Sequence, residues 1–513
     1  MQLPAEIKIE MQNIEDILAL TSMQEGMLFH YLKDPEGSHY VEQLSLHISG
    51  HIELHYFEQA WNVVIAANEM LRTVFRWEKL EKPSQIILKE HQGQLSFNDL
   101  SNMDNYRMKK ALEEIKSNDR DEEFDLIQVP FRIILCKLDE MQYEMVISNH
   151  HILYDGWSNG IILKEFFKAY HEMATGGDTL KLPVKPPFKE FIKWIQSCDR
   201  NKQAKYWREY LAGFETPVGL PIKRRIEEAG TGITGIKGME VYSEILEEDI
   251  GNKLDIFSKN NRVTLAPIFY AAWGVLLQKY CSSEDVVFGT VVSGRPALLK
   301  GIEDTVGLFI NTIPLRVQSA PGVKMTDILS GVEKVLQVRE EFESTPLPDI
   351  GSYSTVGGSE ALFDTIVAIE NYPLDSRLLT GDSLFSVNSY SITEMTHYDL
   401  TVGIMPFNKI EIKFSYKKQL FEKETIENLA RHFERIIRDI IENPETVLSQ
   451  LEIISGEEKN RILYDFNNTA VEYPAGKTIP QLFAEQVGKS PDRIAVTGST
   501  VETLRAASLQ ITY

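Results

Sequence analysis

Apolar and polar positions follow two different periods over the first 175 residues, and these periods predict helices and strands in turn. Apolar side chains recur at helical spacing over Phe57–Met70 and over Ser158–Met173. A helix signal also opens at Asn13, stops at Leu20–Ser22 and resumes near Met23. Runs rich in β-branched and aromatic residues predict strands at 73–77, 85–88, 131–138 and 145–150. This part is therefore expected to form a mixed α/β lobe.

Similar patterns return further along the chain, after a Gly- and Pro-rich connection at Gly176–Pro187. Phe188–Leu211 is expected to be helical, Leu265–Lys279 to form an apolar helix, and Phe421–Asn443 to form a long amphipathic one. Strands are predicted at 285–293, 311–317, 364–371, 398–406 and 410–416, with a turn at 407–409 joining the last two. The order of elements suggests a second lobe that repeats the first.

The composition changes again from about Glu452. One helix, Thr478–Gly488, and one strand, Asp492–Thr497, are predicted beyond that point. About forty residues cannot bury a core of their own, so this stretch is expected to begin a further domain. The predicted organisation is an N-terminal lobe at 1–178, a C-terminal lobe at 179–452, and a linker with a truncated domain start at 453–513.

Charge and composition exclude several classes of function. The 513 residues carry a formal net charge of −22, which leaves no excess of cations for nucleic acid or for an anionic membrane surface. No run of apolar residues is long enough to span a membrane, and the charged N-terminus lacks the apolar core of a signal peptide. Three scattered cysteines do not make a disulfide framework, so a cytoplasmic location is expected.

The most informative run is His150-His151-Ile152-Leu153-Tyr154-Asp155-Gly156, between a predicted strand and a predicted helix. Histidine has the side-chain pKa nearest neutrality, and a loop on a rigid scaffold can present it to a substrate. Alternation along the strand points the two histidines to opposite faces, so only one is expected to face a cleft. Ser158 or Asn159 is expected to cap the helix, and the spacing indicates no metal site.

Further motifs occur in a fixed order along the chain. They are Leu20–His30, Asn68–Phe75, His150–Gly156, Phe188–Trp194, Val306–Arg316, Val367–Pro373 and Tyr398–Val402. This series resembles the condensation domains of non-ribosomal peptide synthetases, relatives of chloramphenicol acetyltransferase. Residues 464–496 resemble the start of an adenylation domain. One departure is Asn68, where the family often has a histidine.

The resemblance implies an α/β (α+β) fold of two chloramphenicol acetyltransferase-like lobes, arranged as a V-shaped pseudo-dimer with a central tunnel. It implies peptide-bond formation between a donor aminoacyl or peptidyl thioester and the α-amine of an acceptor aminoacyl thioester. The partners would be an upstream donor and a downstream acceptor carrier protein, with an adenylation domain adjacent. No cofactor is expected to bind intrinsically, because 4'-phosphopantetheine arrives on the carriers. No carrier precedes Met1 here, so the upstream one is expected on another chain or in an earlier part of a longer one.

The resemblance also assigns residues. His151 would face the tunnel as a general base or as a positioner of the amine, with His150 beside it as a structural histidine. Asp155 would pair with Arg295, or alternatively with Arg72, and the Gly156 amide would lie near the oxyanion. Further residues expected at the tunnel or substrate are Gln24, Trp157, Ser158 and Asn311.

Other functions of the same fold fit the sequence less well. An epimerisation domain shares the histidine motif but usually ends a module, which the adenylation-like tail disfavours. A catalytically silent docking platform typically loses the second histidine, which is present here as His151. Heterocyclisation domains replace the histidine pair with aspartate, and a simple acetyltransferase would not need this length or tail. Condensation is therefore the predicted reaction.

Overall fold

The computed structural model describes residues 9–34, 40–176, 182–224, 238–356, 361–370, 384–394, 396–406, 409–472 and 475–494. The chain divides into two compact units, residues 1–453 and 454–513. Some predictions fall outside the described residues: the turn at 407–408, the end of the strand at 495–497, and the middle of the connection at 177–181.

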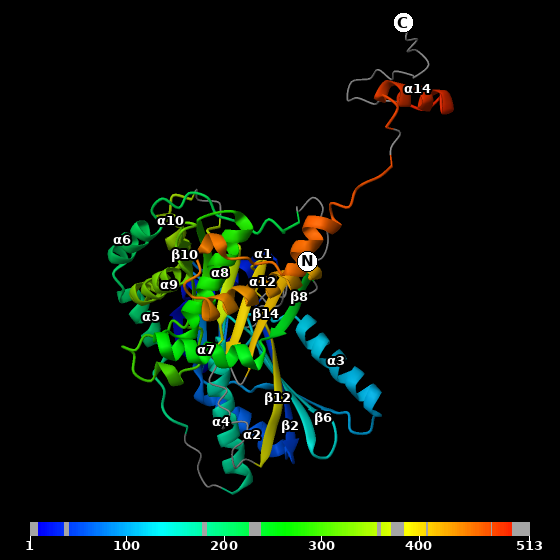
Figure 1. Ribbon diagram of the computed structural model, residues 1–513. Helices are drawn as coiled ribbons and strands as arrows, with labels where there is room; N and C mark the ends of the chain where they lie inside the picture. The colour runs from blue at the N-terminus through cyan, green and yellow to red at the C-terminus, as the bar shows by residue number, and fades with distance from the viewer. Residues whose placement is uncertain are drawn as a thin grey trace. The chain divides into compact units, whose positions relative to one another are not determined.

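A five-stranded sheet forms the scaffold of the N-terminal half of the first unit, in the order β12-β2-β7-β6-β5 (Figure 1). The strands are β2 (Val41–Gly50), β5 (Gln94–Asp99), β6 (Phe131–Lys137), β7 (Gln142–His150) and β12 (Phe385–Glu394). Helices α2 (Leu54–Ala67) and α4 (Gly156–Ala174) pack together beside it, where Trp61 stacks on Phe166 with ring centroids 4.6 Å apart. Helix α3 (Asn105–Asp121) lies between β5 and β6 in sequence.

A small antiparallel sheet, β1-β4-β3, corrects the prediction of a helix from Asn13. Its strands are β1 (Ile14–Ala19), β3 (Thr73–Arg76) and β4 (Ser84–Leu88). Pairing with β4 draws residues 14–19 into an extended strand, so tertiary context overrides the local helical signal. The helix itself, α1 (Ser22–Lys33), starts where Thr21 and Gln24 form a reciprocal capping box.

A six-stranded mixed sheet, β10-β9-β11-β13-β14-β8, forms the C-terminal half. Its strands are β8 (Met239–Ile245), β9 (Asp285–Val292), β10 (Asn311–Gln318), β11 (Thr365–Ile369), β13 (Leu400–Pro406) and β14 (Ile410–Lys417). The helices of this half are α7 (Glu248–Asn261), α8 (Leu265–Cys281), α9 (Met325–Arg339), α10 (Leu347–Tyr353) and α12 (Lys423–Glu442). Helix α8 is buried on nearly every side between α9, α12 and the sheet, which explains its uniformly apolar sequence.

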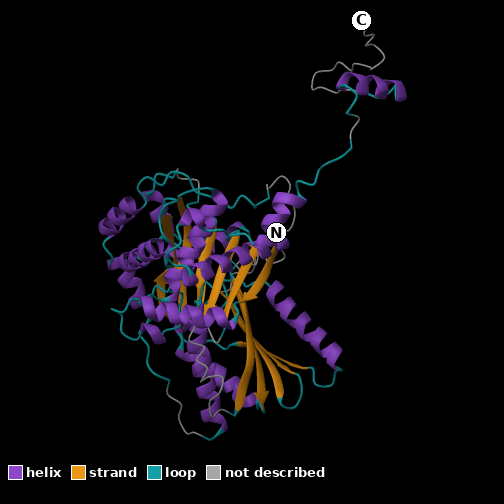
Figure 2. Ribbon diagram, in the orientation of Figure 1, coloured by secondary structure: helices purple, strands orange, loops and turns teal. Residues whose placement is uncertain are grey.

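One strand passes from the C-terminal half of the sequence into the N-terminal sheet. Strand β12 pairs antiparallel with β2 over Phe385–Glu394, although its sequence neighbours β11 and β13 belong to the other sheet (Figure 2). The two halves are therefore joined by strand exchange as well as by packing. Their predicted boundary at 178/179 stays a prediction.

The segment between the two halves is a pair of helices rather than one. Helices α5 (Phe188–Ser197) and α6 (Arg200–Tyr210) are separated at Cys198, where Asp199 starts the second by accepting hydrogen bonds from Asn201 N and Lys202 N. In the second unit the structure has α13 (Gly456–Asn460), a π-helical turn at Arg461–Asp465 and α14 (Ile479–Lys489). None of the helices in the described part of the chain is both long and apolar enough to cross a membrane.

Candidate active site

The histidine motif lies on the turn that links β7 to α4. Strand β7 ends at His150, and α4 begins at Gly156. The N-cap of α4 is Asp155, whose Oδ1 accepts a hydrogen bond from Ser158 N at 3.2 Å. The predicted cap at Ser158 or Asn159 was therefore wrong. The Asp155 carboxylate already accepts a hydrogen bond from a backbone N–H of the first helical turn, which is the role of an N-cap.

The two histidines have different surroundings. His150 packs edge-on against Tyr31, and its Nδ1 accepts a hydrogen bond from Ile152 N at 3.1 Å, so it supports the turn. His151 donates its backbone N–H to Tyr40 O at 2.7 Å, and its Nδ1 lies 3.1 Å from Tyr154 O. Tyr40 has φ of 64°, a left-handed conformation that is costly for a bulky residue and is held by this contact.

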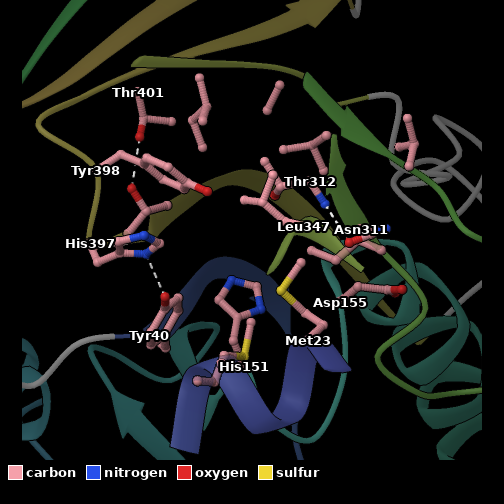
Figure 3. Close-up of a pocket in the computed structure, with 18 of the residues that line it drawn as sticks. Met23, Tyr40, His151, Asp155, Asn311, Thr312, Leu347, His397, Tyr398 and Thr401 are labelled. Atoms are coloured by element: carbon pink, nitrogen blue, oxygen red, sulfur yellow. Dashed lines mark hydrogen bonds between the residues drawn. The ribbon is translucent and has the colours of Figure 1, made fainter. Parts of the chain in front are cut away.

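A cavity of about 940 Å³ opens beside His151 and is lined by residues from both halves of the first unit. The N-terminal half contributes one face of α1, Tyr40 and the turn from His151 to Trp157. The C-terminal half contributes the ends of β9 to β14 and part of α10. Figure 3 shows the ring of His151 pointing toward this space, with Tyr40 on one side and Met23 on the other.

Asp155 pairs with Arg295, at 2.9 Å, and not with Arg72. Both side chains are buried, with exposed fractions of 0% and 6%. Asp155 also accepts a hydrogen bond from Phe309 N at 3.0 Å, while Arg295 donates to Ile302 O and Thr305 O. Because Arg295 and Phe309 belong to the C-terminal half, the carboxylate joins the two halves at the wall of the cavity.

Arg72 lies elsewhere, in the N-terminal half. Its Nη1 is 2.6 Å from Glu15 Oε2, and it also donates to the backbone carbonyl of Leu88. These contacts tie a short 3-10 turn (Glu69–Arg72) to the strand pair β1 and β4, so the alternative partner for Asp155 was wrong.

Gln24 and Ser158 do not line the cavity, contrary to expectation. Gln24 is fully buried, accepts from Thr21 N at 2.9 Å and donates to Ile152 O at 3.0 Å. Ser158 is also fully buried, and its Oγ donates to Asp155 and accepts from Gly307 N. Both residues support the turn that carries His151, because their polar groups are already hydrogen-bonded to neighbouring backbone and side-chain groups.

Trp157, Gly156 and Asn311 do line the cavity. The indole of Trp157 donates to Glu303 O at 3.0 Å and lies over the guanidinium of Arg295. The Asn311 amide donates to Glu343 O at 2.7 Å and to Thr345 O at 2.8 Å, which fixes the start of β10 against the following turn. Trp157 and Asn311 therefore line the cavity, and their hydrogen bonds to backbone carbonyls also stabilise the segments that form its wall.

Two carboxylates beside His151 were missed at the sequence level. Glu42 of β2 and Glu394 of β12 lie opposite each other in the sheet register. His151 Nε2 is 3.3 Å from Glu42 Oε2 and 3.0 Å from Glu394 Oε1. The alternation of Leu44, Leu46 and Ile48 could have revealed β2 and with it Glu42, but no local signal marks Glu394.

These contacts set the charges of the cluster. Burial opposes a charge on His151, yet the carboxylates of Glu394 and Glu42 outweigh it and raise the pKa of His151 to about 10. Burial favours the acid form of Glu394, but the neighbouring imidazole outweighs it and lowers the pKa of Glu394. Burial raises the pKa of Glu42, and it raises the pKa of Glu370, at the end of β11, to about 8. The cluster therefore favours a positive charge on the imidazole.

A second group of aromatic and imidazole rings borders the cavity opposite the aspartate. Tyr40 Oη lies 2.5 Å from His397 Nδ1, and His30 stacks on His397 with centroids 4.2 Å apart (Figure 3). His397 comes from the C-terminal half and the other two from the N-terminal half, so this wall too depends on both halves.

A buried imidazole beside two carboxylates, at a cavity lined by both α/β halves, is an arrangement that can hold or move a proton on a bound substrate. A family model described as "Condensation domain" matches residues 14–463. The chain belongs to this family, whose members form amide bonds in non-ribosomal peptide synthesis.

Curated relatives agree with this assignment. The chain is 35% identical over 510 residues to surfactin synthase subunit 2 of Bacillus subtilis (strain 168), covering 97% of this chain and 14% of the relative. It is 33% identical over 490 residues to gramicidin S synthase 2 of Brevibacillus brevis, covering 94% of this chain and 11% of the relative. The chain thus spans a small part of these synthetases.

Solved structures share the fold. The first condensation domain of the calcium-dependent antibiotic synthetase, in complex with a substrate analogue, matches with a TM-score of 0.70 at 18% identity, covering 86% of this chain and all of that one (100%). The four-domain nonribosomal peptide synthetase holo-AB3403, bound to AMP and glycine, matches with a TM-score of 0.73 at 17% identity, covering 97% of this chain and 38% of that one.

Proposed function

We propose that the chain transfers an aminoacyl or peptidyl group from an upstream carrier-protein thioester to the α-amine of an aminoacyl thioester on a downstream carrier. A C–N bond forms and a C–S bond breaks, while the amine nitrogen loses one proton and the departing thiol takes one up. The observation that carries the proposal is the His151 ring at the wall of a cavity of about 940 Å³ lined by both halves. A cavity of this size is at the upper end of the range for small-molecule sites, so it offers room for two reacting groups.

His151 is the residue proposed to handle the proton of the amine. Tyr154 O fixes the orientation of the ring through Nδ1, which leaves Nε2 as the nitrogen available for proton transfer. A positioned group of this kind contributes about 10²- to 10⁴-fold to a rate. His150, whose Nδ1 is used by the Ile152 amide, is given a supporting role.

The N-terminus of α4 is the proposed place for the developing oxyanion. Gly156 is the first residue of α4 and lines the cavity, and an amide in the first turn of a helix has no intrahelical acceptor. The helix dipole adds partial positive charge at the same point. Asp155 and its partner Arg295 are proposed to hold this helix start in place rather than to touch the substrate.

The partners and compartment are part of the same proposal. Synthetase relatives support carrier proteins that deliver 4'-phosphopantetheine-linked substrates, and an adenylation domain next to this one. The three free cysteines would persist as thiols in a reducing cytoplasm, which is the proposed location. The predicted tunnel with two entrances would let both carriers deliver their arms to His151.

The experiment joins two loaded carriers. A donor carrier bearing a labelled dipeptide and an acceptor carrier bearing an amino acid are mixed with the protein, and intact-protein mass spectrometry follows transfer. His151→Ala is expected to slow transfer by about 10²- to 10⁴-fold, because the proton of the amine loses its acceptor. His51→Ala is the matched control, because His51 is 64% exposed and pairs with Glu53 on the surface.

Two results would reject the proposal. Transfer by His151→Ala at the rate of the His51→Ala control would remove His151 from the reaction. Failure of the wild-type protein to transfer, together with exchange of the donor's α-proton with solvent, would favour epimerisation instead.

A further inference from the structure

The hydrogen-bonding atoms around His151 show how many protons the cluster must hold when no substrate is bound. Nδ1 faces Tyr154 O, and a carbonyl oxygen can only accept, so Nδ1 carries a hydrogen. Nε2 faces one oxygen each of Glu42 and Glu394, which accept when they are ionised. With no proton among these three atoms, only acceptors would face one another, so at least one proton belongs to the cluster.

The sheet register also favours a proton in this cluster. Glu42 and Glu394 are directly opposite on β2 and β12, and like charges in that arrangement destabilise a sheet. An imidazolium between them offsets the repulsion. The pKa of His151 at about 10 agrees with this geometry.

The two glutamates are not equivalent. Glu42 has an exposed fraction of 1%, and its Oε1 accepts a hydrogen bond from Asn159 Nδ2 at 2.5 Å. Glu394 is 27% exposed and lines the cavity. A group that enters the cavity can therefore reach Glu394, while Glu42 stays behind the ring of His151.

The charges around Glu394 point the same way. His151 keeps Glu394 ionised by lowering its pKa, whereas burial raises the pKa of Glu42. Among the described residues, the other charged or titratable groups that face Glu394 are Glu370, which directly follows β11, and Lys413 of β14. Lys413 has Glu411 of its own strand 4.0 Å away. Glu394 is thus the carboxylate at the cavity wall that keeps a negative charge.

We propose that Glu394 is a specificity-determining residue that binds the acceptor's α-amino group in its ammonium form and places it beside His151. The proposal rests on the proposed function, since it needs an amine as acceptor. Before the amine arrives, Glu394 pairs with the imidazolium of His151. As the ammonium takes that place, the Nε2 proton of the ring passes to Glu42, so Nε2 can accept a proton from the ammonium and leave a neutral amine beside it. That amine loses its second proton when it attacks, and the departing thiol takes this proton up.

Binding of two pantetheine-linked probes tests the recognition step without turnover. One probe carries an alanyl group through an amide in place of the thioester, and the other carries a lactyl group, in which a hydroxyl replaces the amine. Wild type is expected to bind the amine probe more tightly, and Glu394→Gln to lose about 10- to 100-fold for that probe alone, the range for a lost hydrogen bond to a charged group. Glu445→Gln is the control, because it breaks one exposed ion pair with Lys324.

The pH dependence separates recognition from a structural role. An α-amine loses its charge near pH 8, so the affinity of wild type for the alanyl probe should fall above that pH. The affinity of Glu394→Gln should stay level, because a neutral amide gains nothing from the charge. Ring-labelled histidine NMR, with the signal assigned by its loss in His151→Ala, should show the midpoint of His151 lowered in Glu394→Gln and unchanged in Glu445→Gln.

Equal affinity of wild type for the amine and hydroxyl probes would overturn the inference, as would an equal loss for both probes in Glu394→Gln. A His151 ring that is neutral at pH 7 in wild type would also overturn it. If the probes are discriminated as expected and yet loaded carriers are never joined, the recognition by Glu394 stands and the proposed function fails.

Discussion

Asp155→Ala tests whether one buried ion pair holds the two halves of the first unit together at the active site. The substitution removes the carboxylate that accepts hydrogen bonds from Ser158 N, Arg295 Nη2 and Phe309 N. It leaves the guanidinium of Arg295, 6% exposed, without its carboxylate. Removal of one partner of a buried pair costs about 3–5 kcal/mol of unfolding free energy.

The structure places the expected cost toward the lower end of that range. Arg295 keeps two carbonyl acceptors, Ile302 O at 2.6 Å and Thr305 O at 2.8 Å, and its guanidinium stays 4.1 Å from the centre of the Phe309 ring. These contacts offset part of the penalty for an unpaired cation. A loss of about 3 kcal/mol is expected, of which about 1 kcal/mol is the helix cap.

The assay is urea unfolding of the whole chain, followed by tryptophan fluorescence. Asp199→Ala is the matched control, because Asp199 caps α6 by accepting hydrogen bonds from Asn201 N and Lys202 N but is exposed and has no described cation partner. Its expected cost is about 1 kcal/mol. The difference between the two variants, about 2 kcal/mol, then measures the ion pair and the contact with Phe309.

Equal unfolding free energies for Asp155→Ala and Asp199→Ala would refute this reasoning. Asp155→Asn adds a second check, because it keeps the volume and the cap but loses the negative charge. An asparagine variant as stable as wild type would show that the charge of Asp155 contributes nothing to holding Arg295.

Three further predictions concern the cavity and the turns around it. Gly294→Ala should abolish soluble folded protein, because φ is +59° and a Cβ would lie 1.8 Å from the backbone carbonyl oxygen of Phe309. The control is Gly213→Ala, where φ is +76° but no atom lies within 4 Å of the added Cβ. It should lower the free energy of unfolding by only about 1 kcal/mol, as measured by thermal unfolding. Gln24→Leu should lower both stability and transfer rate, since it strands a buried amide and a buried carbonyl at about 1–3 kcal/mol each, and a variant with wild-type melting would contradict this. Glu370→Gln should stabilise the protein more at pH 9 than at pH 6, and not at all near pH 4. Burial raises the pKa of Glu370 to about 8, so ionisation of this carboxyl costs stability at every pH above its pKa in the unfolded chain, and glutamine removes that cost. A difference in melting temperature that does not change with pH would contradict this.

Local patterns were enough to predict much of the first unit. The helical stripe over Phe421–Asn443 corresponds to α12, whose buried face includes Ile426, Phe433 and Ile440. The apolar run at Leu265–Lys279 corresponds to α8. In both cases the periodicity of apolar residues reflects the face that is buried, so no long-range information was needed.

Local patterns failed where pairing partners decide the conformation. Residues 14–19 became a strand because β4 supplies their hydrogen bonds, and β12 was not predicted because its partner, β2, precedes it by more than 300 residues in the sequence. The Asp155–Arg295 pair came from the family resemblance and not from spacing. Gln24 and Ser158 were expected at the substrate, but both are buried away from the cavity and support the turn instead.

The position of Glu394 shows how a site residue can depend on a distant irregularity in a strand. Strand β12 pairs with β2 from Phe385 opposite Gly50, and one extra residue enters the ladder at Asn388. Without that bulge, the same starting pair would bring Thr393 opposite Glu42 and would turn Glu394 to the other face of the sheet. The carboxylate therefore meets His151 because of an insertion six residues before it, outside every motif by which the sequence resembles its family.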